Sequence, residues 1–203
     1  MVSLNARRNT LTKAKADVIA YFVFEDKKIF ERQVGSLKKK FKNVSSAIDA
    51  GVFSGTFQET LTLFPSDLKK TKLLLVGVGT TEKLTLERLR RVAATAAKSA
   101  NGLKARTIAL IEPDADSLSS NEALRDWQNV GTALAEGAAL SLYKYTTYIT
   151  DKKKKQSTLK QITVVSEDSN RIREITRGVA LAQVLCEATC FARDLGNAPP
   201  NEI

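Results

Sequence analysis

The chain has 203 residues, of which 43% are hydrophobic and 27% are charged, and its formal net charge is +10. This length and balance are typical of a soluble globular chain that holds one domain, or one domain and part of a second. No stretch approaches the roughly 20 uncharged apolar residues of a membrane span, and residues 1–10 lack the apolar core of a secretory signal. We therefore expect no membrane partner and a cytoplasmic location.

Histidine is absent from the sequence, and the two cysteines, Cys186 and Cys190, are four residues apart. Without histidine, a histidine-dependent catalytic triad or zinc site is excluded. The cysteine spacing places both thiols on one face of a helix. A soft metal would need further ligands that the sequence does not supply, so we expect two reduced, packed side chains.

All of the excess positive charge lies in the first half of the chain. Residues 1–100 hold 19 Lys and Arg against 9 Asp and Glu, whereas residues 101–203 hold 13 of each. Such a balance can attract nucleic acid, but runs of lysine are more often solvated surface. The two lysine clusters lack the aromatic and glycine pattern with which single-strand binders stack bases; they are Lys38, Lys39, Lys40 and Lys42, and residues 152–155.

In chain order, residues 16–26 are rich in β-branched and aromatic residues and predict a buried strand. Residues 47–65 predict one or two shorter strands that end at Pro65. Residues 71–79 contain an uninterrupted apolar run, which predicts a central strand covered on both faces. Thr85 then caps a predicted helix that ends at residues 101–102, with its apolar residues at helical spacing.

Predicted strands and helices also alternate in the second half of the chain. Residues 105–114 predict a strand, and a helix starting near Asn121 carries Leu124, Trp127 and later apolar residues to Leu142 on one side. Residues 160–168 predict another strand, and a long helix follows from Asn170. The fold class is therefore α/β with a substantially parallel sheet.

The turn after the central strand lies where phosphate-binding loops occur. Its candidate ligand residues are Gly77, Gly79, Thr80 and Thr81. Glu82 stands where a dinucleotide loop has its third glycine, and no Gly-Lys-Ser/Thr ending is present. The spacing favours a tight turn over a nucleotide site.

Three alternating carboxylates, Glu112, Asp114 and Asp116, follow the strand at residues 105–114. Hard metal ions bind such oxygen ligands after a strand. We favour the interpretation that these carboxylates form an exposed acidic turn beside Pro113. No nucleophile and base stand out as a pair in the sequence. We predict no catalytic, metal or substrate-binding residue in the chain.

The C-terminal sequence ARDLGNAPPNEI, residues 192–203, resembles the segment that opens the catalytic domain in the leucyl aminopeptidase (cytosol aminopeptidase) family. Residues 73–98 and 136–155 resemble that family's strand, turn and Ala-rich helix, and its Glu-Gly and tyrosine segment, in the same order. Two departures are mild: relatives often have a larger aliphatic residue at Gly196 and phenylalanine at Tyr145. The matches run from about Leu73 to the end of the chain.

The resemblance implies a macro-domain-like mixed sheet flanked by helices over residues 1–168, with a linker helix and the start of the catalytic domain over 169–203. It implies a hexameric enzyme that removes N-terminal residues, leucine prominently, from peptides with two divalent metals, manganese or zinc. The family's catalytic residues and metal ligands all follow the Asn-x-Pro-Pro-Asn segment, so none falls in this chain. We expect this segment alone to be inactive, with roles in assembly and substrate access.

Three hypotheses stay open. The chain is the inert N-terminal part of the enzyme, or a free-standing basic module that binds DNA or a nucleotide-like ligand such as ADP-ribose at residues 77–81, or a structural domain. In the structural case, the exposed face of the helix from Ile172 to Cys190 docks onto the catalytic domain, and the chain alone exposes an apolar stripe.

Overall fold

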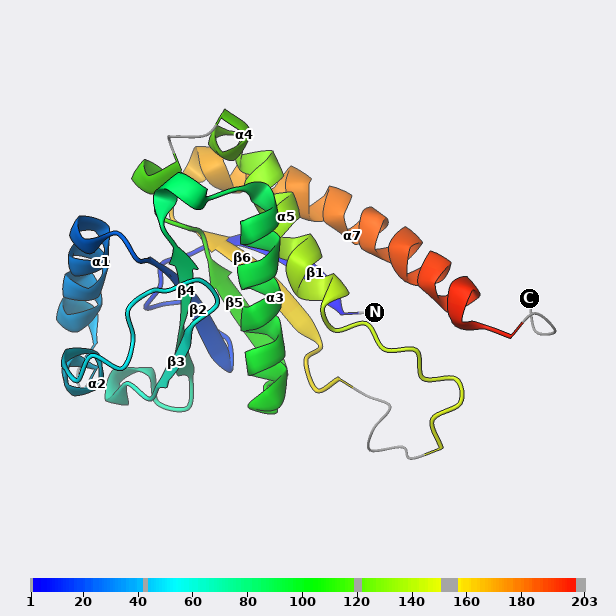
Figure 1. The fold of residues 1–203 in the computed structure, drawn as a ribbon, viewed down its shortest axis with the longest axis horizontal. Coiled ribbons are helices and arrows are strands. Elements are labelled where there is room, and N and C mark those ends of the chain that lie inside the picture. Colours follow the sequence, from blue (N-terminus) through cyan, green and yellow to red (C-terminus); the bar gives the residue numbers. More distant parts are fainter. Residues whose placement is uncertain (1, 42–43, 119–121, 151–156, 200–203) are drawn as a thin grey trace.

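The fold was obtained as a computed structural model that describes residues 2–41, 44–118, 122–150 and 157–199. A six-stranded sheet forms its centre (Figure 1). The strands are β1 (Ser3–Arg8), β2 (Val18–Phe24), β3 (Thr60–Leu63), β4 (Lys72–Gly79), β5 (Thr107–Ile111) and β6 (Gln161–Ser166). The helices are α1 (Lys27–Lys40), α2 (Ser45–Asp49), α3 (Leu86–Gly102), α4 (Glu122–Arg125), α5 (Trp127–Leu140) and α7 (Ser169–Asn197), with 3-10 turns at Ser66–Leu68, Thr81–Lys83 and Ala115–Leu118.

The strand order in the sheet is β1-β6-β5-β2-β4-β3. All neighbouring pairs are parallel except β3 and β4, which are antiparallel. The sheet is thus mixed but mostly parallel, and helices connect several of its strands. The predicted α/β class, with a mixed sheet flanked by helices and a long C-terminal helix, is confirmed.

The helices form one layer on each face of the sheet (Figure 1). Alternate residues of a strand point to opposite faces, so β2 sends Phe22 and Phe24 into one core and Ile19 and Val23 into the other. The first core is shared with α3, α5 and α7, and the second with α1 and α2. Because both faces are covered, the inner strands carry continuous apolar runs.

Several sequence predictions agree closely with the structure. β4 covers the predicted central strand, and its residues from Leu73 to Gly79 are buried. Thr85 caps α3, since its hydroxyl oxygen accepts a hydrogen bond from the backbone amide of Arg88 at 3.2 Å. β2, β5 and β6 lie within the other predicted strand segments.

Other predictions were wrong in detail. The segment at residues 47–65 begins in helix α2 rather than in a strand, and its one strand in the structure is β3. The predicted helix from Asn121 to Leu142 is broken, because Asp126 starts a new helix by accepting the backbone amides of Gln128 and Asn129. Asn121 itself lies outside the described residues.

Two elements were not predicted at all, namely β1 and α1. β1 is an edge strand whose residues are half-buried or exposed, and it pairs with β6 far along the chain. α1 is rich in lysine and buries only Gln33, Val34 and Leu37. The buried Gln33 ties α1 to the sheet, since it accepts from the Phe24 amide and donates to the Phe22 carbonyl.

The long helix α7 packs against α5 and β1 over its first half and then extends beyond them (Figure 1). Asp168 caps it by accepting the backbone amides of Asn170 and Arg171, each at 2.8 Å. Gly178 permits the close approach to α5, because a Cβ atom there would lie 2.1 Å from the Gln128 carbonyl oxygen.

Candidate functional site

The predicted ligand loop at the end of β4 is packed against its own chain. A Cβ atom at Gly77 would lie 1.9 Å from the Thr56 carbonyl oxygen, and Gly79 has a φ of +81°. The amides of Gly77, Gly79 and Thr81 donate to Glu59, Gly55 and Asp26, respectively.

Two side chains around this loop are also engaged, while one is not. The Thr81 hydroxyl donates to Asp26, and the Arg88 guanidinium stacks on Phe57 with 3.9 Å between its carbon and the ring centre. The Thr80 hydroxyl is buried without a hydrogen-bond partner. A phosphate at residues 77–81 would have to displace amide hydrogen bonds that the fold already uses, and the ligand role of Gly77, Gly79, Thr80 and Thr81 stays a prediction.

The three alternating carboxylates form ion pairs rather than one open turn. Arg32 contacts Asp114 at 2.5 Å and Asp116 at 3.3 Å, and Arg171 contacts Glu112 at 2.9 Å. Glu112 is largely buried, with 11% of its side chain exposed, so for this residue the expected exposed turn was wrong. Burial raises the pKa of Glu112, while Arg171 and neighbouring hydrogen bonds oppose the rise.

Metal-ligating side chains do not converge in the described part of the chain. Residues 2–41, 44–118, 122–150 and 157–199 contain no group of three or more His, Cys, Asp and Glu side chains placed to hold an ion. Cys186 is buried and Cys190 is half-buried, and both are free thiols on one side of α7. Burial raises the pKa of Cys186 to about 12, so this thiol stays protonated and unreactive at neutral pH.

The two lysine clusters do not form a recognisable site. Lys38 pairs with Asp49, while Lys39 and Lys40 are exposed at the end of α1. Lys42 and residues 152–155 lie outside the described residues.

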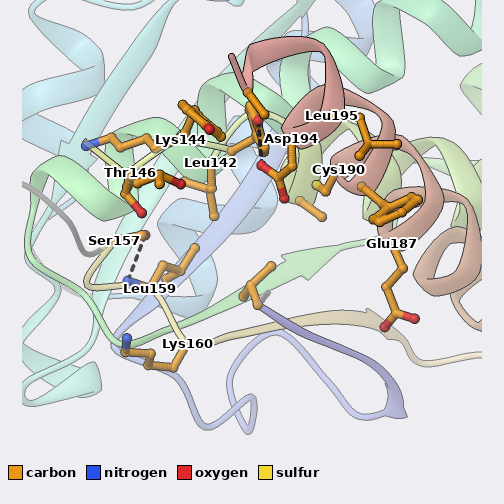
Figure 2. A pocket seen from close by; sticks show the side chains of 17 residues that line it. Leu142, Lys144, Thr146, Ser157, Leu159, Lys160, Glu187, Cys190, Asp194 and Leu195 are labelled. Carbon is orange, nitrogen blue, oxygen red and sulfur yellow. Dashed lines mark hydrogen bonds between the residues drawn. The ribbon is translucent and has the colours of Figure 1, made fainter. Parts of the chain in front are cut away.

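A groove of about 940 Å³ runs between α7 and the segment that follows α5. Figure 2 shows Glu187, Cys190, Asp194 and Leu195 on the α7 side, facing Leu142, Lys144 and Thr146. The remaining lining residues are Val2, Ala139, Tyr143, Tyr145, Thr147, Ser157, Leu159, Lys160, Phe191 and Ala198.

One tyrosine joins the two sides of this groove, and we call its contacts the Tyr143 clasp. The Tyr143 hydroxyl donates to the Asp194 carboxylate at 2.8 Å and accepts from the Asn197 amide at 3.4 Å. The Arg193 guanidinium lies over the Tyr143 ring and donates to the Leu140 carbonyl at 3.4 Å. The clasp holds the last turns of α7 against the segment after α5.

Another side of α7 carries an apolar face that the described part of the chain leaves exposed, and near the end of the helix this face borders the groove; we call it the outer stripe. Its residues are separated by three, four or seven positions, so they share one side of the helix. Val184 is 63% exposed and Phe191 is 64% exposed. The outer stripe consists of Leu181, Val184, Leu185, Phe191 and Leu195. The structural hypothesis expected an apolar stripe between Ile172 and Cys190; three of these residues lie in that range, and Phe191 and Leu195 extend the stripe beyond it.

By length and composition alone, α7 would also be able to cross a membrane, and 28% of its most apolar window is buried. A single helix of this kind is weak evidence for a membrane span. The inner side of α7 buries Ile175, Val179, Ala182 and Cys186 against the rest of the protein. The fold is thus an α/β domain whose C-terminal helix has a second, exposed apolar face in the described part of the chain.

Comparisons with known proteins show which family the chain resembles. Residues 19–152 match the model of the cytosol aminopeptidase family, N-terminal domain. The chain is 23% identical over 202 residues to a probable cytosol aminopeptidase of Alkaliphilus oremlandii, covering 98% of this chain and 39% of that protein. It is 33% identical over 159 residues to the probable cytosol aminopeptidase of Thermosynechococcus vestitus, covering 77% of this chain and 29% of that protein.

Solved structures show the same fold. A mutant of tomato leucine aminopeptidase superposes with a TM-score of 0.79 at 21% identity, covering this whole chain and 40% of the tomato chain. The bottromycin maturation enzyme BotP superposes with a TM-score of 0.60 at 26% identity, covering 91% of this chain and 33% of the BotP chain.

The chain belongs to the cytosol aminopeptidase family and corresponds to its N-terminal domain. It spans about two fifths or less of the length of the relatives described above. The resemblance inferred from the C-terminal motif is thus confirmed. The sequence offered no signal for the Tyr143 clasp, because its partners are about fifty residues apart and meet only in the folded chain.

Proposed function

We propose that this chain is the non-catalytic N-terminal domain of a metal-dependent leucyl aminopeptidase, with residues 1–168 as the domain and 169–203 as the linker helix and start of the catalytic domain. The outer stripe is the surface on which the catalytic domain packs. The observation that carries this proposal is the exposure of Leu181, Val184, Leu185, Phe191 and Leu195 on the helix that leads out of the family's N-terminal domain.

Both faces of α7 then have a role. The inner face fixes the helix to α5 and β1, and Gly178 lets the two helices approach closely. The outer stripe begins at Leu181, whereas Arg173 and Arg177 stand on the same side nearer the start of the helix. The docking surface therefore lies on the C-terminal half of α7, next to the point where the chain continues.

The described residues of this chain do not fit a metal pair, since they hold no cluster of three or more suitable ligands. We derive no catalytic step from them. In the proposed whole protein, two divalent ions, manganese or zinc, would be held outside this chain and would supply the activation of water for removal of N-terminal residues from peptides.

In this proposal, the domain acts through its position relative to the catalytic domain. A rigid module, with α7 held on it by the Tyr143 clasp and the catalytic domain packed on the outer stripe, shapes access of peptides to the active site and contributes to assembly as a hexamer. The relatives are named cytosol aminopeptidases, which supports a cytoplasmic location.

The test uses the full-length protein with Val184→Glu and Phe191→Glu together. A charge buried against a partner without a counter-ion is strongly unfavourable. We expect the variant to lose most of its leucine release from leucyl amide and to sediment as smaller species. Wild-type activity and sedimentation would show that the outer stripe is not covered.

A matched control is Thr176→Glu, on the polar side of the same helix. Thr176 is exposed, and its hydroxyl bonds only to the Ile172 carbonyl within α7. This variant should keep wild-type activity and sedimentation. The 203-residue chain alone should release no leucine when supplied with manganese or zinc.

A further inference from the structure

The loops that enter the parallel strands carry a concentration of positive charge. Eight cations stand within a few residues of the starts of β6, β5, β2 and β4, and we call this set the basic edge. Seven are exposed and Lys72 is half-exposed. The basic edge consists of Lys160 before β6, Lys104 and Arg106 before β5, Lys13 and Lys15 before β2, and Lys69, Lys70 and Lys72 at the start of β4.

These cations are poorly neutralised by the protein itself. In the described part of the chain, none of the eight forms a salt bridge. The acidic residues nearby are Asp17 and Asp67, and the Asp17 carboxylate already accepts the backbone amides of Arg106 and Thr107.

At the opposite ends of these strands, acidic residues are more frequent. Glu25 and Asp26 follow β2, Glu112 follows β5, and Glu167 and Asp168 follow β6. The charge is therefore partly separated along the strand direction, since Lys27, Lys28 and Arg171 accompany these carboxylates while cations predominate at the basic edge. A separation of this kind focuses the electrostatic potential at one edge.

The sheet sets the spacing of the basic edge. β6, β5, β2 and β4 are consecutive neighbours, so their starting loops form a row. Three gaps of about 4.8 Å make this row roughly 14 Å long. One strand of nucleic-acid backbone presents about four phosphates over that length in its helical form.

The middle of the row is hollowed. A groove of about 930 Å³ lies between the segment before β2 and the turn before β4, with Lys13, Lys15 and Lys69 among its lining residues. A flexible backbone can settle into such a groove with cations on both walls.

An exposed aromatic ring stands at one end of the row. β3 pairs antiparallel with β4 and its last residue Leu63 lies opposite Leu73, so Phe64 is placed beside Lys72 at the same edge. Phe64 is 69% exposed. Exposed aromatic rings beside a basic groove stack on the bases of single strands, whereas bases inside a duplex are not accessible to them.

The geometry points to the basic edge as a binding site for single-stranded nucleic acid, with the cations on the phosphates and Phe64 stacked on a base. This inference does not depend on the proposed aminopeptidase role.

The experiment measures fluorescence anisotropy of a labelled oligothymidine of about 16 nucleotides with the full-length protein. We expect binding that weakens roughly 50-fold between about 50 and 200 mM salt, as contacts to about four phosphates predict. Lys13→Glu with Lys15→Glu should weaken binding at least 10-fold. Phe64→Ala should weaken it about 5-fold or more through lost stacking.

The control replaces Lys27 and Lys28 with glutamate, the same change of charge at exposed positions at the start of α1, which follows the far end of β2. The affinity of this variant for the oligothymidine should stay within about 3-fold of wild type. Aminopeptidase activity is measured on the same proteins, so that a failure of the proposed function can be distinguished from a failure to bind nucleic acid. No binding at low salt, an equal loss in the control, or tighter binding of a duplex with no effect of Phe64→Ala would overturn the inference.

Discussion

The Tyr143 hydroxyl donates a hydrogen bond of 2.8 Å to the Asp194 carboxylate, joining the segment after α5 to the end of α7. Asn197 and Arg193 contact the same tyrosine from the same stretch of helix. Beyond Cys186 the helix has few buried residues, so the clasp is a main restraint on its direction. Desolvation and the nearby Asp194 raise the pKa of Tyr143, which keeps the hydroxyl protonated as the donor.

The clasp leads to a first prediction. Tyr143→Phe keeps the ring under Arg193 but removes both hydrogen bonds of the hydroxyl. Backbone amides of residues 191–197 should then exchange with deuterium several-fold faster, while those of residues 172–186 are unchanged. If deuterium exchange is uniform along α7 in both wild type and variant, the clasp does not restrain the end of the helix.

A second prediction concerns the contact between α5 and α7. At Gly178, a Cβ atom would meet the Gln128 carbonyl oxygen at 2.1 Å and the Thr132 amide at 2.8 Å, and both are backbone atoms. Gly178→Ala should therefore lower the free energy of unfolding by about 1–3 kcal/mol or more, measured by urea denaturation.

Gly35, inside α1, provides the matched control, because a Cβ atom there would meet nothing within 4 Å. Gly35→Ala should raise the free energy of unfolding by about 1 kcal/mol through helix propensity. Equal effects of the two substitutions would mean that the helices are not in close contact at Gly178.

The sequence predicted those parts of the fold whose signal is local. The run from Leu73 to Val76 is apolar without alternation because β4 is covered on both faces, and Thr85 marks the start of α3 by its own hydroxyl. β1 carries no such signal, since it is held by pairing with β6, and its side chains are at best half-buried.

The candidate site was harder to predict than the fold. The pattern of α7 showed apolar residues at helical spacing but not which of them faced the protein, and only packing on α5 separates Ala182 from Leu181. The local sequence predicts an exposed turn at Glu112, because it contains no sign of the partner Arg171, which is 59 residues away. Such distant pairs leave no trace in local patterns.

A third prediction concerns the cysteines. Cys186 is fully buried with its pKa raised to about 12, whereas Cys190 lines the groove beside α7. Iodoacetamide at pH 8 should label Cys190 in the native protein and leave Cys186 unlabelled, because the thiolate is the reactive form. Peptide mass spectrometry reads both sites, and prior or equal labelling of Cys186 would be inconsistent with its burial.

A fourth prediction follows from the cap of α7. Hydrogen bonds from the amides of Arg171 and Asn170 lower the pKa of Asp168 below its usual 3.8. Since the folded pKa is the lower one, this carboxylate stabilises the fold above pH 3.8, and that stabilisation is lost as the pH falls through the folded value.

Asp168→Ser isolates this contribution, because serine also caps helices but does not titrate in this range. Melting temperatures at pH 6 and near pH 2 should show a wild-type advantage at pH 6 that shrinks or vanishes in acid. An advantage that grows in acid would reverse the sign and refute this role of Asp168.

Two phenylalanines in one molecule give the most direct test of the docking surface. Phe64 is 69% exposed and Phe191 is 64% exposed in the domain. Hydroxyl-radical footprinting of the full-length protein, read by mass spectrometry, compares their oxidation rates under identical conditions. If the catalytic domain covers the outer stripe, Phe191 is oxidised several-fold more slowly than Phe64; equal rates would show that α7 presents its outer stripe to solvent and not to a catalytic domain.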